Sequence, residues 1–238
     1  MASLTTRTPN GLTNAAPGQT MADAGMLDPT WYYDDTDDFM CYNAGFYTAS
    51  VVGTGAITQT ALDGGAVLLS TSAGAADAVY AQRVVASHKL IAGKDTFFKF
   101  RGILSDVLAD VFYCGLLSTS ATPLSAPDGV YLLKATGQAA LSLVSKIGGV
   151  TTTVALPASN LLVNAVAFEL GIHIKPNGDI AAYFNPSTGQ STTARGPVAR
   201  LFQPALTQVL LSPSFGLLNS AAAIKTLTVD YFVAASQR

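Results

Sequence analysis

The sequence predicts an all-β protein, and the expected architecture is an antiparallel β-sandwich. Only 12% of its 238 residues are charged, and Glu169 is the one glutamate among 15 acidic residues. Exposed helix faces rely on glutamate and lysine, so this composition excludes a mainly helical protein. Apolar residues recur with period two in several segments, as they do in half-buried strands. These segments follow one another at short spacing without a βαβ rhythm, which favours a sandwich.

The first part of the chain lacks this alternation. Residues 1–30 are rich in Thr, Ala, Gly, Pro and Asn, a composition typical of an arm or linker. A cluster of aromatic and acidic residues follows at positions 31–39. We expect an extended N-terminal arm over residues 1–40 and a single sandwich domain over residues 41–238.

Two segments give the clearest strand predictions. In residues 97–104, Phe98 and Phe100 alternate with basic residues. Residues 165–175 place five apolar side chains on one face, those of Val166, Phe168, Leu170, Ile172 and Ile174. Further strands are predicted at residues 111–117, 129–134, 139–145, 150–155, 180–184 and 227–233.

The connections between these strands show turn chemistry. Residues 135–138 separate two strands as a hairpin turn, and the Pro-Asn-Gly-Asp sequence at 176–179 turns the chain again. Residues 75–90 are ambiguous, because their apolar positions fit a helix as well as a strand. No repeat of 20–50 residues is visible, which disfavours a propeller or a solenoid.

The charge pattern excludes several kinds of partner. The formal net charge is −2 and the basic residues are scattered singly, so no nucleic-acid partner is expected. Two long uncharged stretches, 147–168 and 201–224, are interrupted by polar residues and Pro, so no membrane partner is expected either. The N-terminus lacks a secretory signal, which predicts synthesis in a host cytoplasm. Cys41 and Cys114 form no CxxC motif and are predicted to be buried free thiols.

The usual catalytic and metal-binding patterns are also missing. Glycoside hydrolysis needs two carboxyl groups at a fixed separation, whereas Glu169 stands alone and is expected on a solvent face or at a rim. His88 and His173 belong to no cluster of metal-ligating residues, and both are expected at the surface. We expect no enzymatic activity, no cofactor and no metal. An unusual polysaccharide hydrolase that depends on Glu169 is the catalytic alternative.

The acidic run at residues 34–38 has two interpretations. An EF-hand loop would need glycine and glutamate where this chain has Phe39 and Gly45, so only an irregular calcium site stays open. In the structural interpretation, Trp31, Tyr33 and Phe39 close the sandwich while the aspartates cap turns.

A carbohydrate-binding groove needs an aromatic platform. Tyr113, Tyr131 and Tyr183 can supply one, although we favour positions in the core or at a rim for all three.

The order of several short motifs resembles a family of tailed-bacteriophage virion structural proteins. These motifs span residues 31–39, 63–70, 93–101, 128–134, 175–180 and 227–231. The resemblance implies a concanavalin A/laminin-G-like jelly roll and a structural role in the particle. Members of this family include capsid cement, or decoration, proteins. The resemblance supplies no catalytic residues.

From this resemblance we expect a non-enzymatic cement protein on the outer capsid surface of a virion. Its expected partners are the major capsid protein and further copies of itself, with a homotrimer favoured over a dimer. The predicted contact residues are Trp31, Tyr32, Tyr33, Asp34, Asp35, Asp37 and Asp38.

Three other functions remain as alternatives at this stage. The first is a tail-fibre or head-fibre module that binds a glycan, and the second is the hydrolase. The third is a jelly-roll capsid subunit, which the shortage of basic residues in the arm disfavours.

Overall fold

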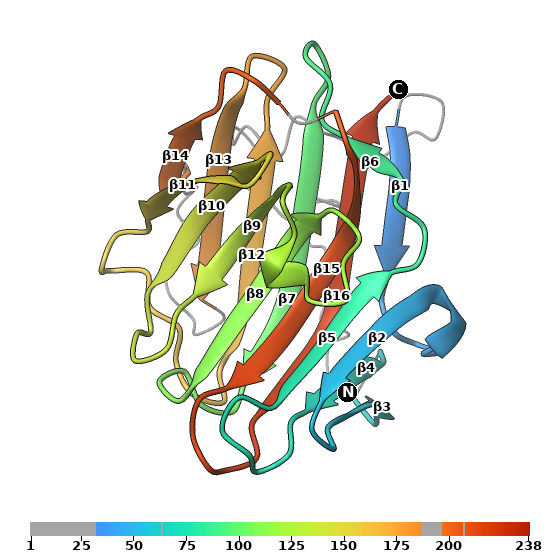
Figure 1. Ribbon diagram of the computed structural model, residues 1–238, viewed down its shortest axis with the longest axis vertical. Coiled ribbons are helices and arrows are strands. Elements are labelled where there is room, and N and C mark those ends of the chain that lie inside the picture. Colours follow the sequence, from blue (N-terminus) through green and yellow to red (C-terminus); the bar gives the residue numbers. More distant parts are fainter. Residues whose placement is uncertain (1–31, 63, 187–196, 207) are drawn as a thin grey trace, which may run out of the picture.

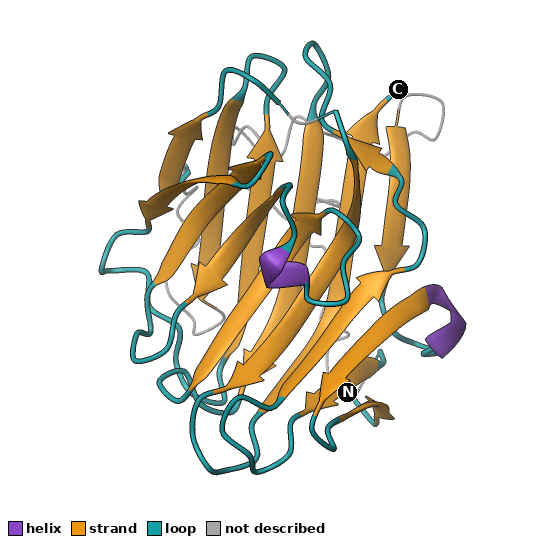
Figure 2. Cartoon of the chain, in the orientation of Figure 1, coloured by secondary structure: helices purple, strands orange, loops and turns teal. Residues whose placement is uncertain are grey.

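The computed structural model describes residues 32–62, 64–186, 197–206 and 208–238. These residues form two antiparallel sheets of eight strands each, packed face to face (Figures 1 and 2). The predicted all-β antiparallel sandwich is confirmed. Within the described ranges, helix is limited to the 3₁₀ segments η2 (Ala44–Phe46) and η3 (Pro123–Ser125). No helix in those ranges is long and apolar enough to cross a membrane.

We call the two layers the rear sheet and the front sheet after their positions in Figure 1. The rear sheet has the order β14 (Ala199–Phe202), β13 (Asp179–Pro186), β12 (Ala167–Ile174), β7 (Thr96–Leu104), β16 (Thr226–Gln237), β4 (Ala66–Ser70), β3 (Ala56–Thr60), and β1 (Tyr32–Asp37) also pairs with β16. The front sheet has the order β11 (Val150–Ala155), β10 (Leu141–Ile147), β9 (Gly129–Lys134), β8 (Asp110–Leu117), β15 (Leu210–Asn219), β5 (Ala78–Arg83), β2 (Tyr47–Val52), and β6 (His88–Lys89) also pairs with β15.

The last strand, β16, organises the rear sheet. Strand β7 pairs along one side of it, with a register shift between Val229 and Tyr231. On its other side, β4 pairs with the first part of β16 and β1 pairs with the last part. Strand β15 has the same place in the front sheet, between β8 on one side and β5 and β6 on the other.

An aromatic core fills the space between the sheets. The rings of Phe39, Phe215 and Phe232 approach one another with centroids 6.1 Å apart. The ring of Phe100 lies 5.7 Å from those of both Phe112 and Phe215. Burying such large rings is the main source of stability in a chain with few charges.

A second, smaller cluster lies on the outer face of the front sheet. It contains the buried rings of Tyr80, Tyr113 and Tyr131, and the segment 118–128 with η3 packs on it. Leu124 and Ala126 contribute to the cluster from this segment. The front sheet is therefore covered on both faces along β8, which explains the continuous apolar run of that strand.

The structure corrects the predicted boundary between arm and sandwich. Strand β1 pairs with β16 from Tyr32 to Asp37, and Phe39 is fully buried in the core. Residues 32–40 therefore belong to the sandwich rather than to an arm. Residues 1–31, which include Trp31, lie outside the described residues.

The predictions for segment 75–90, for the two cysteines and for the individual strands can also be compared with the structure. The ambiguous segment 75–90 forms β5 and β6, so the strand interpretation is correct. Cys114 is buried as predicted, whereas Cys41 is exposed, which contradicts the prediction for it. The predicted strand segments do not include β1, β2, β3, β4, β14 or β15. The short ones show no clear alternation, and β15 is buried on both faces.

Candidate functional site

The predicted contact residues do not form one surface. Tyr33 is 51% exposed, and the guanidinium of Arg238 lies 4.4 Å from the centroid of its ring. Asp34 is also exposed. Tyr32 is half-buried with its ring 6.3 Å from that of Phe97. Tyr33 and Asp34 are therefore the members of the set most available to a partner.

Asp35 and Asp37 point toward the interior between the sheets, on the face of β1 opposite Asp34. They pair with Ala234 and Phe232 of β16, both of which lie in the core. Asp35 forms an ion pair with Arg83, with 2.9 Å between Oδ1 and Nη2. Asp37 lies 3.5 Å from the same guanidinium. These two carboxylates thus join β1 of the rear sheet to β5 of the front sheet.

Tyr47 completes this cluster, which we call the Arg83 cluster: Asp35, Asp37, Tyr47 and Arg83. The Tyr47 hydroxyl donates to Asp37 Oδ2 at 2.6 Å, and its ring centroid lies 4.7 Å from the Arg83 guanidinium. Burial raises the pKa of Asp35 despite the nearby Arg83. Burial, helped by the hydrogen bond to Asp37, raises the pKa of Tyr47. The cluster is a closed internal network, which argues against contact roles for Asp35 and Asp37.

The same acidic run also caps the turn that follows β1. Asp37 Oδ1 accepts from the Phe39 backbone N–H at 2.9 Å, and Asp38 Oδ1 accepts from that of Met40 at 3.3 Å. The structural interpretation of this run is therefore confirmed for the turn caps and for Phe39. Within the described ranges, no group of three or more His, Cys, Asp or Glu residues is placed to hold a metal ion.

Glu169 lies in a polar cluster on the outer face of the rear sheet. Its Oε1 accepts from the Tyr231 hydroxyl at 3.1 Å, and its Oε2 lies 3.9 Å from Lys99 Nζ. Burial lowers the pKa of Lys99 to about 8. The neighbouring Asp230 is paired with Arg101 at 3.2 Å. The Glu169 carboxylate therefore lies among three donor groups: the Tyr231 hydroxyl, Lys99 Nζ and, at 3.5 Å, Asn185 Nδ2.

Both histidines are buried, which contradicts the surface positions predicted for them. His173 Nε2 lies 2.6 Å from Asp95 Oδ1, and its ring stacks on Phe97 with centroids 4.4 Å apart. Burial lowers the pKa of His173 although Asp95 opposes that shift. His88 Nδ1 lies 2.9 Å from Ser236 Oγ, and burial lowers the pKa of His88 to about 4. His173 is therefore buried on the outer face of the rear sheet, opposite the core residues Ile172 and Ile174.

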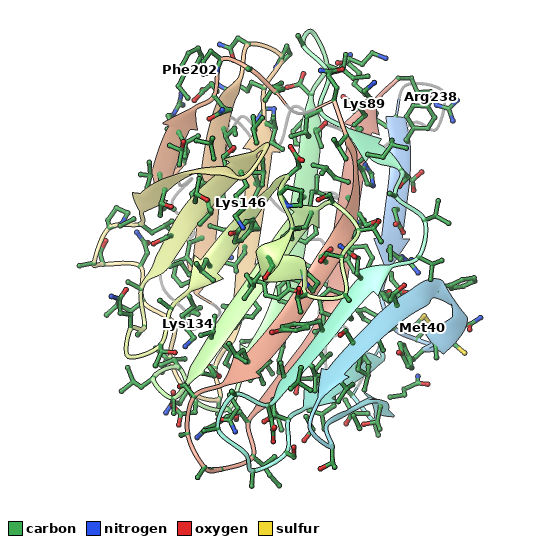
Figure 3. All side chains as sticks on the ribbon, viewed as in Figure 1. Met40, Lys89, Lys134, Lys146, Phe202 and Arg238 are labelled. Atoms are coloured by element: carbon green, nitrogen blue, oxygen red, sulfur yellow. The ribbon has the colours of Figure 1, made fainter. Side chains whose placement is uncertain are left out.

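The three tyrosines proposed as a glycan platform are not brought together on an open surface. Tyr113 is fully buried and Tyr131 is 3% exposed, so both belong to the cluster beneath segment 118–128. Tyr183 lies on β13 of the other sheet. Lys146 Nζ donates to the Leu124 carbonyl oxygen at 2.9 Å and helps to hold the covering segment down (Figure 3).

Segment 39–62 is, like segments 147–168 and 201–224, a long stretch without a charged residue. It carries no Asp, Glu, Lys or Arg, and it contains both β2 and β3. These are the end strands of the front and rear sheets, and both lie on the same side of the sandwich (Figure 1). We call this side the uncharged edge and define it as residues 40–62. No sequence motif marks this edge. The sequence shows only the absence of charged residues between Asp38 and Asp63.

No protein-family model matches the chain, and no curated protein matches it. Solved structures do match. A β-glucanase of Bacillus licheniformis aligns at 11% identity and a TM-score of 0.60, with 84% of this chain and 97% of the other covered. Lectin II from Ulex europaeus aligns at 10% identity and a TM-score of 0.58, with 87% and 99% covered.

An endo-β-1,4-glucuronan lyase of the fungus Trichoderma reesei aligns at 11% identity and a TM-score of 0.57. It covers 84% of this chain and 94% of its own. Together with the sheet topology, these likenesses identify the fold as a concanavalin A-like jelly roll. They extend to the fold alone, because identities this low carry no site residues.

Proposed function

We propose that this chain is a non-enzymatic virion structural protein, a cement protein that binds the outer surface of a phage capsid as a homo-oligomer. The ordered motifs that resemble phage virion proteins support the proposal. The observation that carries it is the division of the surface. Many charged side chains are committed to pairs within the chain, while the uncharged edge offers apolar and hydroxyl groups.

These internal pairs are spread over both sheets. They join Arg83 to Asp35, Arg101 to Asp230, Lys134 to Asp110, His173 to Asp95, Lys225 to Asp106, and both Lys175 and Arg200 to Asp179. A protein that bound a charged or strongly polar ligand would present such groups to that ligand. A protein that assembles through many weak, repeated contacts needs complementary surfaces with few charges to desolvate.

The deciding experiment is the copy number of this chain in purified virions, measured against the most abundant capsid protein. A cement role predicts a simple ratio to the capsid subunit and hundreds of copies, on the order of the number of capsomer junctions. Absence from the particle would overturn the proposal. A few copies, or a few tens, would favour a fibre instead.

A second measurement addresses the contact residues. The paired substitution of Tyr33→Ala and Asp34→Ala removes the exposed members of the predicted set and leaves the Arg83 cluster in place. We expect weaker binding to capsids that lack this protein. The matched control is Arg200→Ala, which removes an exposed charge on β14 and should bind as the wild type does. Equal binding by all three proteins would remove Tyr33 and Asp34 from the contact.

A glycan-binding module is the second candidate, because the structural likeness to lectins favours it. It predicts saturable binding on a glycan array and a fibre-like copy number. The catalytic alternative predicts polysaccharide turnover that Glu169→Gln abolishes. Glycan binding without any binding to capsids would replace the first proposal with the second.

A further inference from the structure

The outer edge of β2 combines features that natural edge strands avoid. The strand is six residues long, carries no charge and no proline, and pairs with β5 without a register shift. Edge strands in soluble proteins are ordinarily protected by lysines, prolines, bulges or a covering segment, because an open edge recruits further strands. Among the residues that the structure describes, no strand lies beyond β2 in the front sheet.

The direction of the backbone groups follows from the register. The Val84 N–H donates to the Phe46 carbonyl oxygen at 3.1 Å, so residues 46 and 84 form a hydrogen-bonded pair. Such pairs alternate along an antiparallel ladder. Thr48, Ser50 and Val52 therefore bond to β5, whereas residues 49 and 51 direct their N–H and C=O groups away from the sheet. The Tyr47 C=O also faces outward, while its N–H donates to the Ala44 carbonyl oxygen. This spacing suits a further antiparallel strand.

The two ends of β2 carry complementary side chains. At its start, Phe46 is 58% exposed and Val84 is 50% exposed. At its end, Val51 and Val52 are 40% and 46% exposed. A two-fold axis through the middle of the strand would place the start of one copy against the end of another. Apolar groups would then meet apolar groups at both ends, with no like charges facing each other across the axis.

From these features we infer that β2 is a homodimerisation edge, at which two copies pair β2 with β2 in antiparallel register and join their front sheets into one continuous sheet. The partner is a second copy of this chain, because a two-fold axis brings the apolar start of β2 in one copy against its apolar end in the other. The inference rests on the proposed self-association but not on the capsid role. It selects the dimer over the trimer favoured by the sequence analysis.

A rival edge in the same sheet provides the control. Strand β11 ends the front sheet on the opposite side, is also uncharged, and exposes Thr153. It differs in packing against β14 of the rear sheet. Pairing of β2 with β11 of the next copy would be head-to-tail and would form a ring or an open chain. Substitutions on the two strands therefore distinguish the modes.

The test measures the mass of the full chain by light scattering after size exclusion, from about 1 to about 100 µM. We expect twice the 24.5 kDa of one chain. Ala49→Pro blocks the outer edge without removing a bond to β5, and Val51→Lys places a charge opposite Tyr47 of the other copy, where it would lose its hydration. Each should weaken dimerisation at least tenfold. The controls Thr153→Pro and Thr153→Lys should remain dimeric.

Each result decides the inference, provided that circular dichroism shows the fold retained. Two independent β2 substitutions guard against the misfolding of either one. A monomeric wild type over the whole range would overturn it, as would β2 variants that stay dimeric. A trimer would also overturn it, and loss of association in both the β2 and the β11 variants would show head-to-tail pairing. Capsid binding by a monomeric wild type would leave the cement proposal standing while removing this one.

Discussion

Arg83 on β5 and Asp35 on β1 form an ion pair that joins the two sheets, with Nη2 and Oδ1 2.9 Å apart. Their side chains are 13% and 20% exposed, and the guanidinium also lies 5.3 Å from the Phe232 ring centroid. The pair therefore links the first strand to the core and to the edge that carries β2.

Arg83→Met should lower the free energy of unfolding by about 2–3 kcal/mol, because it leaves two largely buried carboxylates without their cation. Urea denaturation at pH 7 measures this. The matched control is Arg200→Met, which removes a half-exposed partner of Asp179 and should cost less than about 1 kcal/mol. Equal losses would mean that the Arg83 cluster is no more than a surface contact.

The fully buried pair of Lys134 and Asp110 provides a second prediction. Lys134 Nζ lies 2.5 Å from Asp110 Oδ1 and donates to the Val107 carbonyl oxygen at 2.8 Å. Lys134→Met alone should cost about 3–5 kcal/mol, because it leaves an unpaired buried carboxylate. The double substitution with Asp110→Leu should recover most of that loss. A double variant as unstable as the single one would show that packing, not the stranded charge, accounts for the loss.

Stability should fall as the pH drops from 6.5 toward 4, partly through His88. Burial holds the pKa of folded His88 at about 4, below the ordinary histidine value of about 6.5, so the unfolded chain binds the proton more readily in this window. The buried neutral ring therefore adds to the free energy of unfolding at high pH, and about 2 kcal/mol of that free energy is lost by pH 5. His88→Asn should flatten this part of the curve of unfolding free energy against pH. An unchanged slope in the variant would assign the effect elsewhere, His173 being the other buried ring with a lowered pKa.

Two tyrosine hydroxyls should respond in opposite directions to the same substitution. The buried Tyr113 Oη has no hydrogen-bond partner among the described residues, whereas Tyr47 Oη donates to a carboxylate at 2.6 Å. Tyr113→Phe should therefore leave stability unchanged or raise it by up to about 1 kcal/mol. Tyr47→Phe should lower it by about 1.5–3 kcal/mol. Thermal unfolding of the two variants side by side provides the comparison, and a loss in Tyr113→Phe would contradict it.

The clearest strand predictions are those for strands whose two faces differ. In β12, Phe168, Leu170 and Ile172 face the core while Glu169 lies on the opposite face, so the alternation is visible in the sequence. Strand β2 shows no such contrast, because an edge strand exposes residues on both faces. The sequence places β1 in the arm, because the first part of the chain lacks the alternation of apolar and polar residues. Asp35 and Asp37 face the core here because both lie beside the guanidinium of Arg83, which is more than 45 residues later in the sequence.

The site residues depended on long-range pairing of this kind. His173 contacts Asp95, which is 78 positions away in the sequence, and His88 contacts Ser236, which is 148 positions away. No local pattern reveals such partners, so both histidines were expected at the surface. The fold class needed only composition and periodicity, which are local properties of the chain.

The pairing of β1 with β16 also has a mechanical consequence. Tyr32 faces Gln237, so the chain enters the sandwich and leaves it at the same end of one antiparallel pair. A force that pulled these two ends apart would unzip the hydrogen bonds of the ladder one pair at a time, the direction in which a β-ladder resists least. If the protein stabilises a particle, as we propose, internal pressure would have to load it across its sheets rather than through its ends.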